Sequence, residues 1–373
     1  MNGARRNLLG LSREELVEFA ASIGEARYRG TQLFHWLYGR GVTSFGGMTD
    51  LGKAFRERLS VASTIEGLTP VAVRRSRDGT MKFLFMLGDG ARIESVLIPP
   101  ASAFVGREAA HDDEQKRLTL CLSTQVGCPL DCVFCATGTM GYLRNLSAGE
   151  IVDQFLQIRR AAGRKVTNVV FMGMGEPLMN YDNVMRAVEI LSAGAGIAAW
   201  RIVISTAGWA PHIRRLGEEG RTVKLALSLH SAVEATRARL MPVTRKFGLA
   251  ELRSALEQFY RATRRRVTYE VIFFDGINDT EEEISALIRF ARVVPCKINV
   301  IPFHSILFTG MKGIGARLRP SRRQSEIVEQ LRKAHLTVMV RSSAGEDIEG
   351  ACGQLAVREG ALRRGPARTV SLS

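Results

Sequence analysis

The stretch Cys128-Pro129-Leu130-Asp131-Cys132-Val133-Phe134-Cys135 places three thiols within eight residues, shortly after an apolar segment with strand character. Zinc in a structural site takes four protein ligands, and a cubane iron–sulfur cluster has four irons to ligate. Three cysteines therefore leave one position open, where a cofactor or substrate can bind. Two interpretations follow: an open iron–sulfur cluster, or a zinc site completed by Cys121 or a histidine.

The spacing of these thiols, three intervening residues and then two, resembles that of the radical S-adenosylmethionine (SAM) enzymes. The resemblance implies that Cys128, Cys132 and Cys135 hold a [4Fe-4S] cluster whose fourth iron is left to SAM. Phe134, the aromatic residue before the last cysteine, belongs to the same pattern.

The bulk composition is that of a globular protein with a polyanionic partner. The 373 residues carry a formal net charge of +15, and lysine and arginine number 52. Such a basic balance favours nucleic acid as partner. No run approaches the ~18 apolar residues of a membrane helix, so we expect a cytoplasmic protein. The main basic runs are 74–77, 159–165, 264–266, 317–323 and 358–368.

The chain divides into four segments by pattern. Residues 1–65 read as a helical accessory module, opened by the capping box Ser12-Arg13-Glu14-Glu15. Its aromatic stripe at helical spacing predicts core rather than a binding surface. Residues 66–117 read as a small β segment followed by a linker, 118–355 as the main domain, and 356–373 as a basic tail.

From Leu118 onward, strand patterns alternate with helical ones. Six strand–helix repeats predict a parallel sheet, and their short connections predict an α/β partial (βα)6 barrel. A second capping box, Ser147-Ala148-Gly149-Glu150, opens the first crossover helix. The expected strands are 118–122, 168–172, 201–205, 223–228, 267–274 and 297–302, followed by a helix over 321–335 and a strand over 337–341.

Chemistry in such barrels gathers at the carboxyl ends of the strands. Gly173 and Gly175 allow close backbone approach to a ligand, and Glu176 is suited to an ammonium or a ribose hydroxyl. The other groups at strand ends are Ser205, Ser228, Leu229, His230 and His304. For the serines the alternative role is helix capping, and for His230 it is a structural hydrogen bond.

Two cysteines outside the cluster motif lie near the start and the end of the barrel. Cys121 precedes Cys128 by seven residues, and Cys352 follows the last strand. Taken singly, each is expected to be a buried thiol. As a pair they suit a nucleophile and its partner, because two thiols can close a disulfide and release a covalent adduct.

Together these motifs resemble the RlmN/Cfr family of radical SAM RNA adenine methyltransferases, more closely its RlmN-type members. The resemblance runs from the helical module to Cys352. Its motifs are Cys121-Leu122-Ser123-Thr124-Gln125-Val126-Gly127-Cys128, Phe134-Cys135-Ala136-Thr137-Gly138, Arg144-Asn145-Leu146, Gly173-Met174-Gly175-Glu176-Pro177, Ser228-Leu229-His230, Cys296-Lys297-Ile298-Asn299 and Ala351-Cys352-Gly353-Gln354-Leu355.

The resemblance implies a role for each matching residue. Cys352 is implied as the residue methylated by a first SAM, with a second SAM supplying the radical. Cys121 is implied to assist loss of the ring proton and to close a disulfide with Cys352, and Glu94 to accept a proton. Implied SAM contacts are Gly175, Glu176, Ser205, Ser228, Leu229, His230 and, by position, His304. At His304-Ser305 the chain departs from the family, whose members carry Asn-Pro there.

The resemblance implies methylation of C2 of adenine in large-subunit ribosomal RNA, with transfer RNA as a further candidate substrate and flavodoxin or ferredoxin as the class of reductant. Methylation at C8 is the rival within the family. Two alternative functions come from other classes of protein. One is a radical SAM enzyme that acts on a protein or small molecule, and the other is a non-catalytic RNA-binding protein stabilised by a structural zinc ion. The basic runs and the Cys121/Cys352 pair argue against a radical SAM enzyme that acts on a protein or small molecule.

Overall fold

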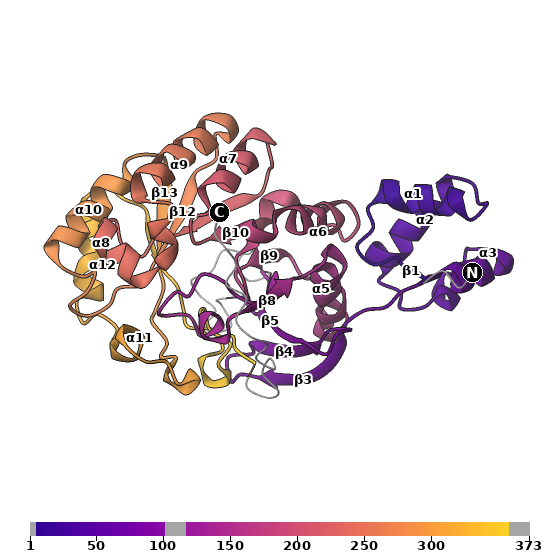
Figure 1. The fold of residues 1–373 in the computed structure, drawn as a ribbon, viewed down its shortest axis with the longest axis horizontal. Coiled ribbons are helices and arrows are strands. Elements are labelled where there is room, and N and C mark those ends of the chain that lie inside the picture. Colours follow the sequence, from indigo (N-terminus) through magenta and orange to yellow (C-terminus); the bar gives the residue numbers. More distant parts are fainter. Residues whose placement is uncertain (1–4, 101–116, 358–373) are drawn as a thin grey trace.

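The computed structural model describes residues 5–100 and 117–357, in which a small helical module stands beside a large α/β barrel (Figure 1). Most of the linker expected over 99–117, and all but two residues of the tail expected over 356–373, lie outside the described residues. The module consists of β1 (Arg6–Asn7), α1 (Arg13–Ser22), α2 (Tyr28–Phe34), η1 (His35–Arg40), η2 (Phe45–Gly47), α3 (Lys53–Ala62) and β2 (Ser63–Thr64).

The helices of the module begin and pack as the sequence predicts. The Ser12 side chain accepts from the Glu15 N–H, and the Glu15 carboxylate accepts from the Ser12 N–H, which completes the capping box at the start of α1. Trp36 and Leu37 are buried in the hydrophobic core. The prediction that the aromatic stripe is core is therefore confirmed.

The barrel is built on one sheet of ten strands in the order β14-β13-β12-β11-β10-β9-β6-β5-β4-β3. All pairs from β6 to β14 are parallel, so the predicted partial barrel is confirmed. These strands are β6 (Thr119–Cys121), β9 (Asn168–Phe171), β10 (Ile202–Thr206), β11 (Lys224–Ser228), β12 (Val267–Val271), β13 (Cys296–Val300) and β14 (Val338–Val340).

Helices cover the outer face of this sheet (Figure 1). Leu, Ile, Val and Phe side chains at helical spacing are buried against the strands, while the charged faces remain exposed. The capping box of Ser147 and Glu150 is present at the start of α5. The main helices are α5 (Ala148–Ala162), α6 (Tyr181–Ala193), α7 (Ala210–Glu218), α8 (Glu234–Leu240), α9 (Leu249–Thr263), α10 (Glu281–Ala291), α11 (Ile314–Arg317) and α12 (Gln324–Lys333).

Three antiparallel strands, β3 (Thr69–Arg75), β4 (Met81–Met86) and β5 (Arg92–Ile98), extend the barrel sheet at one edge. They join it through β5, where Val96 lies opposite Cys121 of β6. The small β segment predicted within 66–117 thus forms, but it is continuous with the barrel sheet. This continuity brings Glu94 to the same edge as the cysteine motif, across the long connection that separates them in sequence.

The module docks on α5 and α6 through close backbone contacts. A Cβ on Gly10 would lie 2.5 Å from the Gly149 nitrogen, so only glycine fits there. The Tyr38 hydroxyl donates to the Leu11 carbonyl at 2.9 Å and accepts from the Gly10 N–H at 3.0 Å. Arg186 of α6 pairs with Glu15 of α1. These contacts fix the module beside the barrel (Figure 1).

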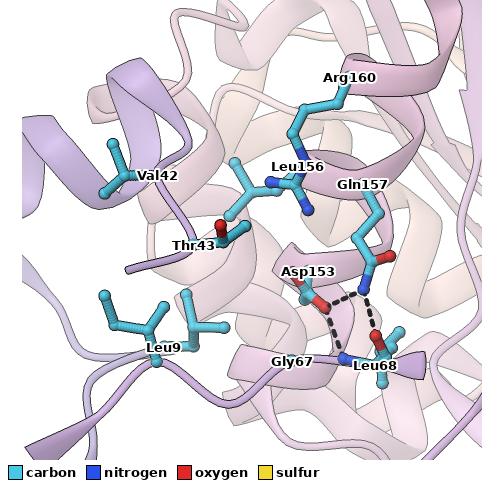
Figure 2. A pocket seen from close by; sticks show the side chains of 10 residues that line it. Leu9, Val42, Thr43, Gly67, Leu68, Asp153, Leu156, Gln157 and Arg160 are labelled. Carbon is cyan, nitrogen blue, oxygen red and sulfur yellow. Dashed lines mark hydrogen bonds between the residues drawn. The ribbon is translucent and has the colours of Figure 1, made fainter. Parts of the chain in front are cut away.

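A cavity of about 220 Å³ lies between the module and α5 (Figure 2). Asp153 and Gln157 of α5 hold the chain that leaves the module: the Asp153 carboxylate accepts from the Leu68 N–H at 2.6 Å and from Gln157 Nε2 at 2.7 Å. Gly67 lies directly against Asp153. The polar groups facing the cavity therefore anchor the connection between module and barrel.

In the segments that the structure describes, no helix combines the length and the apolar character required to cross a bilayer.

Candidate active site

The cysteine motif occupies a loop that leaves β7 (Gln125–Gly127) and leads to η4 (Ala136–Met140). Backbone hydrogen bonds tie it to three distant segments. The Cys128 N–H donates to the Gly141 carbonyl at 2.8 Å, the Val133 N–H to Leu240 at 3.1 Å, and the Ala136 N–H to Gly353 at 2.7 Å. Asp131 takes a left-handed conformation at φ 48°, which turns the chain between the first two thiols.

The three cysteines of this loop are partly buried and lie close enough for their charges to interact. Burial raises the pKa of Cys128, Cys132 and Cys135, and the neighbouring thiols raise those of Cys128 and Cys132 further. The guanidinium of Arg237 opposes this effect at Cys132. Thiols grouped in this way become good ligands when a metal displaces their protons.

The donor set fits a cluster better than a single ion. The donors on this loop are the free thiols of Cys128, Cys132 and Cys135. A zinc ion requires its sulfur ligands about 2.3 Å from one point. Each thiolate of a cubane cluster instead binds a different iron, and three soft sulfur donors on one loop suit that arrangement.

The segment that carries Cys352 packs directly on this loop. The Gly353 carbonyl accepts from Ala136, and the Leu355 carbonyl accepts from the Thr137 hydroxyl at 2.7 Å. Gly353 has φ 80°, a conformation that suits glycine, and sits against the Phe134 carbonyl. Cys352 is partly buried and near enough to Cys135 for its charge to raise the pKa of that thiol.

Cys121, at the end of β6, lies close to Cys352. Burial is the main cause that raises the pKa of Cys121 to about 12, and the charge of Cys352 adds to it. Arg341, just after β14, acts on both thiols and draws its own raised pKa chiefly from Cys352. The barrel thus brings together two cysteines separated by most of its length.

Glu94 lies on β5 at the same edge of the sheet. Its carboxylate is buried, forms an ion pair with Lys82 Nζ at 3.1 Å, and accepts from the Ala356 N–H at 3.1 Å. Burial raises the pKa of Glu94, while the charge of Lys82 opposes the shift. The last described residues of the chain therefore pass between Glu94 and the cysteine loop.

The environment of the Glu176 carboxylate differs from the one expected of a residue that contacts a ligand. Its carboxylate is buried and accepts from the Ala207 N–H at 2.7 Å and the Leu178 N–H at 3.0 Å. Burial raises its pKa to about 7, against the effect of these hydrogen bonds. In this structure Glu176 ties together the loops that follow β9 and β10.

Gly173 and Gly175 serve a close approach within the protein itself. A Cβ on Gly173 would lie 2.7 Å from the Leu122 carbonyl oxygen. Gly175 has φ 98°, and a Cβ there would lie 2.5 Å from Cβ of Gln125. The glycines are required because the loop after β9 presses on the chain that enters the cysteine motif.

Ser205 and Ser228 lie at the carboxyl ends of β10 and β11, and both are partly buried. Leu229 follows and is fully buried. The buried Arg237 orders these ends: its Nη2 donates to the carbonyls of Ala207 at 2.6 Å and Ser228 at 3.1 Å, and its Nε to that of Leu229 at 3.1 Å. Sequence reasoning missed Arg237, because the sequence does not distinguish it from the surface arginines.

His230 makes a structural hydrogen bond in this arrangement. It has φ 55°, its Nδ1 accepts from the Ile272 N–H at 3.1 Å, and its ring lies 4.4 Å from that of Phe134. Burial lowers its pKa to about 3, and Arg237 adds to the effect. The neutral imidazole therefore supports the cysteine loop through Phe134.

His304 is buried on the loop after β13. Its Nδ1 lies 3.3 Å from the Glu346 carboxylate, without the geometry of a hydrogen bond. Glu346 itself is largely exposed and belongs to the segment leading to Cys352. His304 therefore lies next to the chain that brings Cys352 to the site.

A polar row inside the barrel was also missed from the sequence. Glu270 of β12 lies opposite Ser228 on β11 and Asn299 on β13, and its Oε1 accepts from Asn299 Nδ2 at 3.0 Å. Its other oxygen lies 3.9 Å from Arg341 and has no hydrogen-bond partner. The signal was present, because Glu270 and Asn299 are polar residues within otherwise apolar strands.

The fold and the three-thiol loop are those of a radical SAM enzyme, and residues 122–291 match the family described as the Radical SAM superfamily. A crystal structure of a radical SAM methyltransferase from Sphaerobacter thermophilus is 40% identical with a TM-score of 0.83, and the match covers 94% of this chain and 99% of that one. Membership of this superfamily implies a [4Fe-4S] cluster and SAM as cofactors.

Further matches define a narrower family within the radical SAM superfamily. Residues 6–65 match the Ribosomal RNA large subunit methyltransferase N-terminal domain. The Dual-specificity RNA methyltransferase RlmN of Geobacter sulfurreducens is 43% identical, over 96% of this chain and 94% of its own length. The protein of that name from Rhodospirillum rubrum is 42% identical, over 95% of this chain and 81% of its own. The chain belongs to the RlmN family of radical SAM RNA methyltransferases, as its motifs predicted.

Proposed function

We propose that the protein methylates C2 of an adenine in large-subunit ribosomal RNA, with transfer RNA as a second substrate. The observation that carries the proposal is the pair of neighbouring cysteines, the buried Cys121 and the partly buried Cys352, beside the three-thiol loop. The relatives' name, dual-specificity RNA methyltransferase, supports two kinds of RNA substrate.

In this proposal Cys128, Cys132 and Cys135 hold the cluster, and the ends of β9, β10 and β11 face SAM. When bound, the cluster and SAM supply the 5′-deoxyadenosyl radical that removes hydrogen from a methyl group on Cys352. SAM contacts are assigned to Gly175, Glu176, Ser205, Ser228, Leu229, His230 and His304. Flavodoxin or ferredoxin is the class of donor that would reduce the site.

Cys352 is the methyl carrier in this scheme. Its sulfur takes a methyl group from a first SAM, so that two SAM molecules are used per turnover. The methylene carbon on Cys352 then bonds to the ring carbon of adenine, which joins enzyme and RNA covalently. A thiol suits this role because sulfur is a strong nucleophile and also a good leaving group. The contacts of Gly353 and Leu355 with the cysteine loop support its placement.

Cys121 resolves the adduct in this scheme. It assists loss of the ring proton, and the surplus electron of the adduct would return to the cluster when bound. The Cys121 thiolate then attacks the Cys352 sulfur, and the carbon–sulfur bond breaks with its electron pair going to the methylene carbon, which takes a proton to become the methyl group of the released RNA. A thiol reductant would reduce the Cys121–Cys352 disulfide before the next turnover. Glu94 is assigned as a proton acceptor. Burial raises its pKa, which makes the carboxylate a better proton acceptor, and its hydrogen bond with Ala356 supports a place near the Cys352 segment.

The test of this scheme is capture of the adduct. Cys121→Ala incubated with RNA, SAM and a reductant should give a protein–RNA band that survives denaturation. Cys121→Ala combined with Cys352→Ala should give none, because the attaching sulfur is gone. Cys296→Ala is the matched control: Cys296 donates to the Ala291 carbonyl outside the cysteine pair, so its loss should leave turnover intact. No adduct from Cys121→Ala under turnover conditions would refute the role of Cys121.

A further inference from the structure

The edge of the barrel opposite the cysteine loop carries a dense set of cations. In a parallel sheet all strands begin at the same edge. Arg201 immediately precedes β10, Lys224 is the first residue of β11, Arg266 immediately precedes β12, and Lys297 is the second residue of β13. We call these four residues the basic row.

The basic row crosses four neighbouring strands at nearly the same level. Lys224 lies opposite Val203 on β10, and Lys297 lies opposite Thr268, two residues after Arg266. With neighbouring strands about 4.8 Å apart, three steps between strands make a row about 14 Å long. Such a length suits an extended anionic chain better than one small anion.

The cations of the row repel one another. Burial lowers the pKa of Lys224, and the charges of Arg265, Arg266 and Arg201 are further causes in the same direction. Lys297 shows the same direction, with burial first and Lys224 and Arg266 among the lesser causes. A bound polyanion would relieve this repulsion.

Carboxylates in the described residues do not neutralise the row. None of its four side chains takes part in an ion pair within the described part of the chain, and Glu219, the nearest acidic residue before Lys224, already pairs with Arg215 and Arg221. Glu270 attracts Lys297 from inside the barrel without contact. Among the described residues, the charge of the row is therefore left for an external partner.

An exposed tryptophan stands at one end of the row. Trp200 is 50% exposed, with the Arg201 guanidinium carbon 4.7 Å and Lys224 Nζ 5.7 Å from its ring centroid. An indole between cations is the combination that single-stranded nucleic acid uses, because bases stack on the ring while phosphates meet the charges. The same connection from α6 to β10 packs on the helical module at Gly194, which lies against Tyr38.

We propose that Trp200 and the basic row form a second RNA-contacting surface, which binds an unpaired stretch of a large substrate remote from the target adenine. The proposal rests on the proposed function for the choice of RNA as occupant. Strands of five residues place this surface about 16 Å from the catalytic edge. A long RNA reaches both edges, whereas a minimal stem-loop held at the catalytic edge reaches only one.

The test is binding of a fluorescein-labelled single-stranded RNA of about 30 nucleotides, followed by anisotropy over a salt series. Lys224→Glu combined with Arg266→Glu should weaken binding at least tenfold and lower the salt slope by about one to two. Arg253→Glu combined with Arg261→Glu, on exposed positions of α9, is the matched control with the same loss of charge. It should change affinity less than about twofold.

Trp200 is tested separately by two substitutions. Trp200→Ala should weaken RNA binding about tenfold without changing the salt slope, and Trp200→Phe should restore most of it, because stacking needs a ring and not a charge. Unfolding midpoints and iron content measured for each variant show that the fold is kept.

Equal affinity and slope for the row variant and its control would overturn the proposal, as would binding of phosphatidylserine vesicles through the row with no binding of RNA. The assay involves no methyl transfer, so its failure leaves the proposed function untouched. If methylation fails while the row binds RNA, the proposed function alone is refuted.

Discussion

Lys82→Met is expected to destabilise the protein strongly and in a pH-dependent way. Lys82 and Glu94 form a pair 3.1 Å apart, with side chains only 5% and 7% exposed. Removing one partner of a buried pair typically costs about 3–5 kcal/mol, because the other charge stays buried. Methionine keeps the unbranched chain of lysine and removes the ammonium with its hydrogen bond to the Glu349 carbonyl.

Protonation of Glu94 limits how much stability Lys82→Met can lose, because a protonated carboxyl carries no buried charge. Near pH 7 the carboxyl takes up a proton about 2.7 units above its ordinary pKa, which costs about 3.7 kcal/mol at about 1.36 kcal/mol per unit. Near pH 5 the same step costs about 1 kcal/mol. Without Lys82 the folded-state pKa of Glu94 rises further above its unfolded value, because burial raises it and the opposing charge is gone. The deficit is therefore small at low pH and grows as pH rises toward the folded-state pKa.

Urea unfolding followed by tryptophan fluorescence near both pH values measures this deficit. Lys82→Met with Glu94→Gln should recover most of the stability near pH 7 and show little pH dependence, because no buried charge remains. Lys53→Met removes an exposed pair with Glu57, 86% and 66% exposed, and should cost less than about 0.5 kcal/mol. A Lys82→Met deficit below about 1 kcal/mol near pH 7, or one independent of pH, would show that Glu94 does not remain as an unpaired buried charge.

Three further predictions concern the site. Cys132→Ala should lose most bound iron after anaerobic reconstitution, whereas Cys296→Ala should keep it; equal iron in both would contradict the assignment of the cluster ligands. Gly173→Ala should cost about 2 kcal/mol in urea unfolding, because its Cβ meets the Leu122 carbonyl at 2.7 Å, while Gly88→Ala, with no atom within 4 Å, should be nearly neutral. In the metal-free protein, burial raises the pKa of Glu176 to about 7, so the protonated carboxyl stabilises the fold at low pH. The free energy of unfolding should therefore fall by up to about 3 kcal/mol as pH rises from the unfolded-state pKa of this group through about 7. Glu176→Gln should remove that pH dependence, and parallel stability–pH curves would argue against a raised pKa.

Much of the fold was predictable because local patterns and tertiary structure agree. The strand–helix alternation after Leu118 predicted the parallel barrel, and capping boxes at Ser12 and Ser147 fixed two helix starts. The continuity of β3–β5 with the barrel was not predictable from periodicity, since the pairing of Val96 with Cys121 is a long-range contact. Alternation reveals a strand without revealing its neighbour.

The site was predictable only where the spacing of residue types along the chain indicates the chemistry. The cysteine loop and the strand-end groups follow from motif and topology. Arg237 and Glu270 were missed because their importance lies in burial: one orders three carbonyl groups, and the other keeps an oxygen without a hydrogen-bond partner inside the barrel. The role of Gly173 was also incomplete, since its close approach is to Leu122 and not only to a ligand.

Nucleoside mass spectrometry of the RNA product shows which carbon of adenine the enzyme methylates. Ribosomal RNA lacking the modification is incubated with reconstituted enzyme, SAM and a reductant, and its nucleosides are then separated and weighed. We expect 2-methyladenosine with wild-type protein and none with Cys352→Ala. Formation of 8-methyladenosine would contradict the assigned ring position while keeping the cysteine chemistry. Formation of 5′-deoxyadenosine without any methylated nucleoside would contradict RNA as the substrate.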